Sequence, residues 1–188
     1  GFPLARERWT LISAFCSVQP ALVLVYLKII KSAEIYFKSM LKSSNNLIGV
    51  FDSGLGGLSV LKKFLSDVPG YSYIYLGDSA RVPYGNKSPE TIYNYTIQAV
   101  DFLFRQNCHL VIIACNTASA QALRRLQKEW LPKHYPNRRV LGVIKPLAEA
   151  AANNNFKKIG IIGTTATIKS ETYPKEIHEL NSKLKVYG

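Results

Sequence analysis

The sequence predicts an α/β fold built on a parallel sheet. From Leu47 onward, short apolar runs alternate with amphipathic stretches, which is the pattern of successive βα units. One of these runs, Leu110–Ala114, is continuously apolar, as expected for a strand that helices bury on both faces. We expect strands at five runs: Leu47–Phe51, Tyr73–Leu76, Leu110–Ala114, Val140–Ile144 and Lys158–Ile162.

Helices are expected between these strands. Three leucines at helical spacing, Leu58, Leu61 and Leu65, predict a helix after the first strand. Ser88 followed by Pro89 is typical of a helix start, with the serine as cap and the proline in the first turn. This second helix should run to about residue 105. A third helix is expected from 117 to about 130, and a fourth begins near residue 146. In such a fold, the loops that follow the strands lie at one edge of the sheet, where open α/β folds bind ligands.

The composition is that of a folded globular protein with a basic surface. The chain has 188 residues, of which 47% are hydrophobic and 19% charged, and this excludes a generally disordered protein. The net charge of +12 favours an anionic partner without choosing among nucleic acid, membrane and small anion. The basic residues come as separate pairs, without the aromatic residues that accompany them in nucleic-acid sites: Lys62–Lys63, Arg124–Arg125, Arg138–Arg139 and Lys157–Lys158. We interpret them as a solvated surface.

The cysteines and histidines predict neither disulfides nor a metal site. Cys16, Cys108 and Cys115 are an odd number and lack CxxC spacing, so a disulfide framework or a structural zinc site is not expected. The histidines are far apart and lack the spacing of metal ligands on one helix: His109, His134 and His178. These residues fit a reducing compartment, and we expect a cytoplasmic protein.

Residues 1–46 differ from the rest and are interpreted as an unassigned basic leader outside the fold. The apolar stretch 11–30 follows two arginines, as a targeting segment would, but polar residues break it, and a membrane span needs about 20 mostly apolar residues. Met40 is the one methionine and precedes the first expected strand. We therefore interpret residues 1–39 as upstream sequence translated from a misplaced gene start, and expect them to add no strand to the sheet.

The first loop at the ligand-binding edge is Asp52-Ser53-Gly54-Leu55-Gly56-Gly57. A glycine-rich turn that enters a helix leaves backbone N–H groups free to hold an anion. The turn lacks GxGxxG spacing, and its acid would repel a pyrophosphate, so a carboxylate or an amino acid suits it better. Ser53 can then donate a hydrogen bond, and Asp52 can bind an ammonium group or help to move a proton. The alternative is a plain connection in which Asp52 is a local cap.

The second loop, Gly77–Gly85, is too long for a tight turn and carries several hydrogen-bonding groups, as ligand-binding loops often do. Gly85 can present a backbone N–H beside the Tyr84 hydroxyl. An ordinary surface loop stiffened by Pro83 would need the same residues, so both readings stay open at this loop.

The third loop carries Cys115-Asn116-Thr117, at the point where a buried strand ends and a helix begins. The positive end of the helix dipole favours a thiolate there, so Cys115 is placed to act as a base or nucleophile. The alternative is that it is a small buried apolar residue. Cys108 precedes the same strand, so we expect it at the opposite edge and inert.

Three motifs in this order, Phe51–Gly57, Gly77–Gly85 and Ala114–Ala120, resemble those of glutamate racemases. The resemblance continues through Gly142–Ile144 with Pro146 and through Ile161–Ser170 with Tyr173, so it covers residues 47–188. It implies two similar parallel-sheet α/β domains with the active site between them. The first would be residues 47–146, and residues 147–188 would begin a second domain that is incomplete here. Lys145-Pro146-Leu147-Ala148 departs from the family, which usually has a glycine after the proline.

The resemblance also implies a reaction and its residues. Glutamate racemases need no cofactor or metal, interconvert L- and D-glutamate with one cysteine on each face of the α-carbon, and supply D-glutamate for peptidoglycan. Cys115 would exchange the proton of D-glutamate. The positions that match the family's substrate-binding residues are Asp52, Ser53, Tyr84, Gly85, Asn116 and Thr117. The family's second cysteine motif, Gly-Cys-Thr-His, does not occur in the 188 residues, so we expect this chain alone to be inactive.

The sequence is also compatible with other functions. Some glutamate racemases bind DNA gyrase, so a non-catalytic gyrase-binding protein is one alternative, and a protein anchored to a membrane by residues 11–30 is another. Aspartate racemases work similarly, but the combination of Asp52-Ser53-Gly54 with Pro83-Tyr84-Gly85 resembles the glutamate type. The expected small-molecule partner is glutamate. A homodimer stays open, a gyrase partner has no supporting motif, and no membrane contact is expected.

Overall fold

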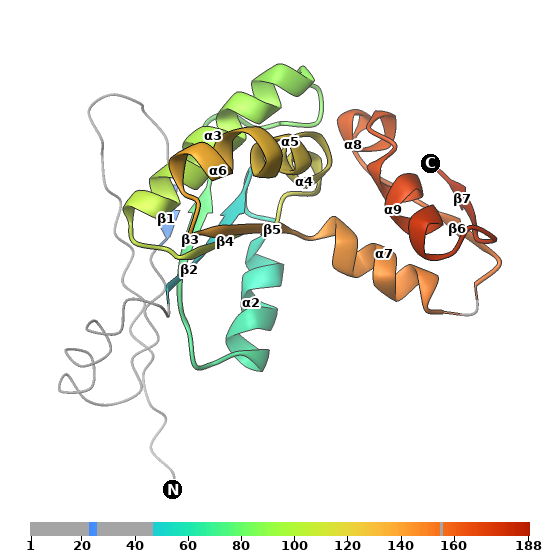
Figure 1. Ribbon diagram of the computed structural model, residues 1–188, viewed down its shortest axis with the longest axis horizontal. Helices are drawn as coiled ribbons and strands as arrows, with labels where there is room; N and C mark the ends of the chain where they lie inside the picture. Colours follow the sequence, from blue (N-terminus) through green and yellow to red (C-terminus); the bar gives the residue numbers. More distant parts are fainter. Residues whose placement is uncertain (1–22, 26–46, 155) are drawn as a thin grey trace, which may run out of the picture.

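The computed structural model describes residues 23–25, 47–154 and 156–188. Within these residues, a sheet of five strands has the order β1-β3-β2-β4-β5 (Figure 1). Its members are β1 (Val23–Val25), β2 (Leu47–Asp52), β3 (Ser72–Gly77), β4 (Leu110–Ile113) and β5 (Arg139–Gly142). The pairings β2–β3, β2–β4 and β4–β5 are parallel, and only the edge pairing β1–β3 is antiparallel. The predicted parallel-sheet α/β fold is confirmed.

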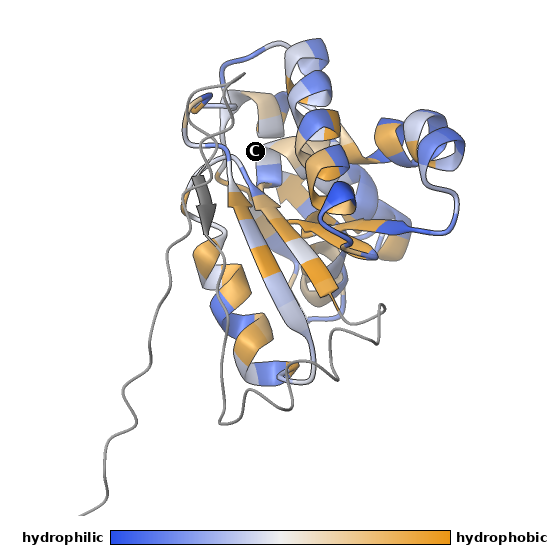
Figure 2. Ribbon diagram, turned by 90° about the vertical axis from the view of Figure 1, so that its left-hand side faces the viewer, coloured by the Kyte–Doolittle hydropathy of each residue, from blue (hydrophilic) through white to orange (hydrophobic). Residues whose placement is uncertain are grey.

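Helices cover both faces of this sheet. Helix α2 (Leu58–Asp67) lies on one face and α3 (Pro89–Arg105) on the other (Figure 1). Neighbouring residues of β2 point to opposite faces, so Val50 packs in the cluster that contains Leu61 of α2, and Phe51 packs in the cluster that contains Leu103 of α3. Figure 2 shows the strands rich in hydrophobic residues, while the surrounding helices carry both hydrophobic and hydrophilic ones.

The helix predicted to begin at Ser88 is confirmed. The Ser88 Oγ accepts a hydrogen bond from the Thr91 N–H at 3.2 Å, and Pro89 occupies the first turn, where its missing N–H costs nothing. The helix ends at Arg105, and two residues later Asn107 has a positive φ of 64°. Asparagine tolerates this left-handed conformation better than most residues, so it lets the chain turn back into β4.

The prediction of one unbroken helix over residues 117–130 is wrong. The chain instead forms α4 (Asn116–Gln121), α5 (Leu123–Arg125), the π-helical turn η1 (Leu126–Trp130) and α6 (Leu131–His134). In η1 the Leu131 N–H bonds to the carbonyl of Leu126, five residues back. Pro132 follows directly and has no N–H to continue the regular pattern, so the helix changes its winding at this point.

Two predicted strands end earlier than expected. The run Val140–Ile144 forms a strand only to Gly142, because Ile144 already begins α7 (Ile144–Ala152) and is buried there. The predicted helix near Pro146 is this α7, with the proline in its first turn. The run Lys158–Ile162 forms β6 (Lys158–Gly160), and the Ile162 side chain is fully exposed at 102%. An apolar run alone does not show where a strand stops.

The prediction that residues 1–39 add no strand to the sheet is wrong at β1. Val23 pairs with Gly77 and Val25 with Tyr75 across an antiparallel ladder. An edge strand offers a row of unpaired N–H and C=O groups, and Val-Leu-Val is a sequence of high β-propensity, which accounts for the pairing. The rest of the leader, with most of the apolar stretch 11–30, lies outside the described residues. In the described part of the chain, no helix is both long and apolar enough to cross a membrane.

The C-terminal part forms a second, smaller unit. Strands β6 and β7 (Lys185–Tyr187) make a parallel pair, accompanied by α8 (Thr165–Lys169) and α9 (Thr172–Leu180). Its core joins Ala148 of α7, Ile177 of α9 and Leu184. The predicted division between residues 146 and 147 falls inside α7, which leads from the first sheet to this unit (Figure 1).

Candidate active site

The three predicted loops meet at the carboxyl ends of β2, β3 and β4. The Asp78 N–H donates to the carbonyl of Asp52 at 3.0 Å, which joins the first and second loops. The Cys115 Sγ and the Ser53 Oγ lie 3.2 Å apart, which joins the first and third. The parallel strands therefore bring the residues of all three motifs to one edge, as expected from the fold.

Asp52 is buried and holds the glycine-rich turn closed. Its Oδ2 accepts hydrogen bonds from the N–H groups of Gly54 and Gly57, both at 3.1 Å. The alternative reading of Asp52 as a local cap is thus correct for this oxygen. Within the described part of the chain, Oδ1 makes no hydrogen bond, so only one of the two carboxylate oxygens fixes the turn.

Two glycines allow the backbone to pack closely beneath this turn. A Cβ added to Gly77 would lie 2.5 Å from the carbonyl oxygen of Gly54, and one added to Gly57 would lie 2.7 Å from the Cβ of Asp52. Real Cβ contacts are longer than this, so a side chain at either position forces the turn to move. The Tyr75 hydroxyl also donates to the Gly54 carbonyl at 2.8 Å, and burial raises the pKa of this phenol, which keeps the donor protonated.

We expect Gly77→Ala to lower the free energy of unfolding by about 1 to 3 kcal/mol, since the added methyl group meets rigid backbone rather than a flexible side chain. Urea unfolding followed by circular dichroism measures this change. Gly70→Ala is the matched control, because nothing lies within 4 Å of its added Cβ. Equal effects from the two substitutions would contradict the close approach at Gly77.

Cys115 occupies the cap position of α4. Its backbone is extended (φ −70°, ψ 117°), and its Sγ accepts the Ala118 N–H at 3.4 Å. The sulfur therefore takes one of the backbone N–H groups that the first turn of the helix leaves without a partner inside the helix. Cys115 is 95% buried, yet its sulfur contacts the Ser53 hydroxyl where the three loops meet. The position suits a group that takes up and returns a proton.

Cys108 lies at the other end of β4, as expected. Its side chain is fully buried, and this burial raises the pKa of the thiol to about 12. Its carbonyl oxygen accepts a hydrogen bond from Arg138 at 2.9 Å. Cys108 is therefore a protonated core residue at neutral pH, away from the loops that hold Cys115.

The Tyr84 side chain turns into the core, so its hydroxyl does not lie free beside the Gly85 N–H. Its ring packs between Phe51 and Tyr95, and its hydroxyl donates to the Asp78 Oδ2 at 2.5 Å. Burial raises the pKa of Tyr84, and the hydrogen bond to Asp78 raises it further. Only the backbone of Tyr84 can therefore face a ligand. Spacing in the sequence could not show this, because the ring turns into the core.

Gly85 brings the second loop against α8. A Cβ at Gly85 would lie 2.4 Å from the Cβ of Thr164, and the Gly85 carbonyl accepts the Ala166 N–H at 3.1 Å. Within the described residues, the Gly85 N–H has no hydrogen-bond partner. Thr164 therefore links the second loop to the C-terminal unit.

Asn116 and Thr117 face the C-terminal unit from the start of α4. The exposed Asn116 accepts a hydrogen bond from the Tyr173 hydroxyl at 2.6 Å. The buried Thr117 hydroxyl lies 3.0 Å from the Thr164 Oγ1 and 3.3 Å from the Thr167 Oγ1. The sequence analysis gave Tyr173, Thr164 and Thr167 no role in the site. The only signal was the cap pattern of Thr164 and Thr167 at i, i+3.

A hollow of about 480 Å³ opens beside these polar residues. Asn116, Thr117, Thr164 and Tyr173 form its polar side. The rest is mainly apolar and comes from α7, α9 and the region of β6: Leu147, Ala151, Ile159, Ile161, Ile162 and Ile177. Asp52, Ser53 and Cys115 do not line it, so the hollow lies next to the thiol rather than over it. Among the described residues, no three His, Cys, Asp or Glu side chains group as a metal site.

These loops on a parallel α/β sheet define a racemase fold, and the chain belongs to the Asp/Glu/hydantoin racemase family, whose model matches residues 48–188. Within that family it is similar to glutamate racemases. It is 46% identical to the glutamate racemase of Geobacter metallireducens over 141 residues, which are 74% of this chain and 50% of the relative. The chain therefore spans about half the length of the curated relatives it matches.

Solved structures of glutamate racemases share the fold. The enzyme from Aquifex pyrophilus superimposes with a TM-score of 0.67 and 43% identity, over 74% of this chain and 54% of that one. The enzyme from Francisella tularensis, crystallised with D-glutamate, gives a TM-score of 0.67 and 40% identity, over 77% of this chain and 52% of that one. The resemblance suggested by the three motifs is confirmed.

Proposed function

We propose that this chain supplies one half of a glutamate racemase active site, with Cys115 as the acid/base on one face of the substrate. The observation that carries the proposal is the position of the Cys115 sulfur, between the Ala118 N–H and the Ser53 hydroxyl, where three family motifs converge. Relatives at 46–49% identity carry the name glutamate racemase, which favours glutamate over aspartate as substrate.

In the proposed reaction, the Cys115 thiolate takes the α-proton of D-glutamate, and the electron pair of the broken C–H bond stays on a planar α-carbon. A second acid then protonates the opposite face, which gives L-glutamate. That second group belongs to the half of the relatives that this chain does not span. The free Asp52 Oδ1 suits the substrate ammonium, and the Gly85 N–H and the Asn116 amide suit its carboxylates.

The proposed setting of this activity is the bacterial cytoplasm, where D-glutamate is consumed in peptidoglycan synthesis. The family resemblance supports this setting. The absence of CxxC spacing among the three cysteines fits a reducing compartment.

The proposed function is tested by completing the site. We expect residues 1–188, joined to the C-terminal half of the Aquifex pyrophilus glutamate racemase, to convert L-glutamate to D-glutamate and to leave L-aspartate unchanged. Chiral chromatography of the products measures both conversions. A joined protein that melts cooperatively and yet does not racemise glutamate would contradict the proposal.

A further inference from the structure

Tyr173 reaches from α9 to the start of α4. Its side chain is 93% buried, and its hydroxyl donates to the Asn116 Oδ1 at 2.6 Å. Burial raises the pKa of the phenol, so the hydroxyl keeps its proton at neutral pH and acts as a donor. The contact joins residues 57 positions apart in the chain, one from each structural unit.

A side-chain amide has an oxygen that accepts and an NH₂ group that donates, and the hydrogen bond from Tyr173 fixes which way each of them points. When the oxygen of Asn116 accepts a proton from Tyr173, the NH₂ group points away from the tyrosine. In the described part of the chain, that NH₂ group has no hydrogen-bond partner, and Asn116 is exposed next to Cys115. An amide turned the other way would present its oxygen instead, which repels a carboxylate.

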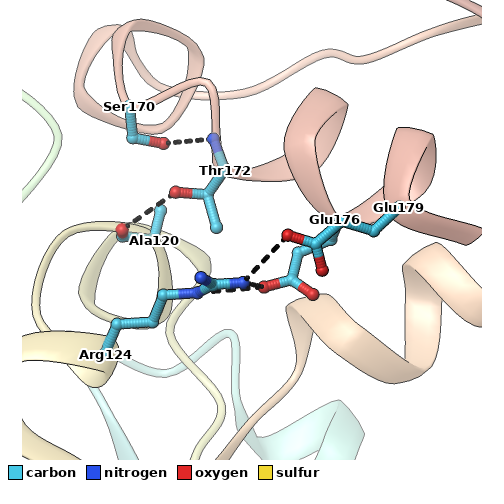
Figure 3. A network of polar contacts seen from close by, with 6 residues as sticks. All are labelled: Ala120, Arg124, Ser170, Thr172, Glu176 and Glu179. Atoms are coloured by element: carbon cyan, nitrogen blue, oxygen red, sulfur yellow. Dashed lines mark hydrogen bonds and ion pairs between the residues drawn. The ribbon is translucent and has the colours of Figure 1, made fainter. Parts of the chain in front are cut away.

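Polar contacts hold the first turns of α9 against α4 and α5 (Figure 3). The Thr172 hydroxyl donates to the carbonyl of Ala120 at 3.1 Å. One turn later, the Arg124 guanidinium lies 2.5 Å from the Glu176 carboxylate and 3.8 Å from that of Glu179. Tyr173 lies between these attachments in the chain, so its hydroxyl has a fixed position relative to Asn116.

We infer that Tyr173 is a positioning residue, whose hydroxyl orients the Asn116 amide so that its NH₂ group faces a substrate carboxylate. The inference rests on the proposed function for the ligand, D-glutamate, but it concerns a residue outside the three loops. By this inference the C-terminal unit contributes to substrate recognition, and it does so only through the contact of Tyr173 with Asn116.

The test measures binding of D-glutamate to the 188-residue chain by NMR titration. We expect Tyr173→Phe, which removes only the hydroxyl, to weaken binding by about 3- to 10-fold, the range for one oriented hydrogen bond. Tyr135→Phe is the matched control, because it removes a hydroxyl that donates to Asp101 at 2.7 Å and should leave binding unchanged. The Tyr135 ring packs on Phe104, near Cys108 at the end of β4 opposite the three loops. Thermal melting of both variants separates binding from folding.

A double-mutant cycle shows whether Tyr173 acts through Asn116. Asn116→Ala should weaken binding, and adding Tyr173→Phe to it should weaken binding no further. Asn116→Asp keeps an acceptor for Tyr173 but loses the NH₂ donor, so it should also bind D-glutamate less well. In the unaltered chain, the side-chain NH₂ signals of Asn116 should shift on titration, and Tyr173→Phe should abolish that shift.

The outcomes separate the inference from the function on which it rests. Unchanged binding in Tyr173→Phe, or additive losses in the double mutant, would overturn the role of Tyr173 and leave the proposed function standing. No saturable binding of D-glutamate to the unaltered chain would overturn the inference together with the proposed use of these loops.

Discussion

Cys115→Ser is expected to reduce racemisation by about 10²- to 10⁴-fold in the protein joined to the Aquifex pyrophilus half, because an alcohol is a far weaker base than a thiolate at neutral pH. The serine hydroxyl can still accept the Ala118 N–H, so the start of α4 should keep its shape. The initial rates in both directions, measured by circular dichroism of glutamate, give the size of the loss.

Cys108→Ser is the control for this experiment. Cys108 is fully buried at the opposite end of β4, so its replacement should lower the melting temperature while leaving the rate of the folded enzyme nearly unchanged. If both substitutions reduced the rate equally, the assignment of Cys115 as the acid/base would be wrong.

The 188-residue chain alone is expected to produce no net racemisation. Inversion needs a proton donor on each face of the planar carbanion, and Cys115 is the one cysteine that the described residues bring to the three loops. A proton removed by Cys115 can return only to the face it left. In heavy water, the chain should therefore exchange the α-hydrogen of D-glutamate for deuterium with retention of configuration.

Two measurements follow this partial reaction. Proton NMR reports the loss of the α-hydrogen signal, and chiral chromatography reports the configuration. We expect the exchange to be slow, since the open hollow beside the site admits water, which weakens the interactions that stabilise a carbanion. Conversion of L- to D-glutamate by the chain alone would show that water or another side chain supplies the second proton.

The main features of the fold could be predicted because they depend on local pattern. The apolar run that forms β4 and the cap at Ser88 each specify an element within a few residues. Two features were missed for different reasons. Strand β1 forms by pairing with the distant β3, which local pattern does not show. The change of winding at η1 is local, just before Pro132, but an apolar pattern of helical spacing does not show how a helix is wound.

The candidate site divides in the same way. The positions of Asp52, Ser53 and Cys115 followed from parallel strands that end at one edge. The burial of the Tyr84 ring did not follow, because a loop sequence does not show which side chains turn inward. Likewise, Tyr173 comes next to Asn116 only through the docking of α9 on α4 and α5, and no spacing in the sequence encodes that contact.

The close packing of Gly77 against the Gly54 carbonyl has a consequence for how such genes evolve. In a copy of the gene whose product no longer needs to racemise, selection on the Cys115 thiol ends and the codon is free to drift. Selection on Gly77 persists for as long as the product must fold, because any side chain there pushes against backbone. The two positions can be equally invariant among working enzymes and still diverge at very different speeds once the activity is lost.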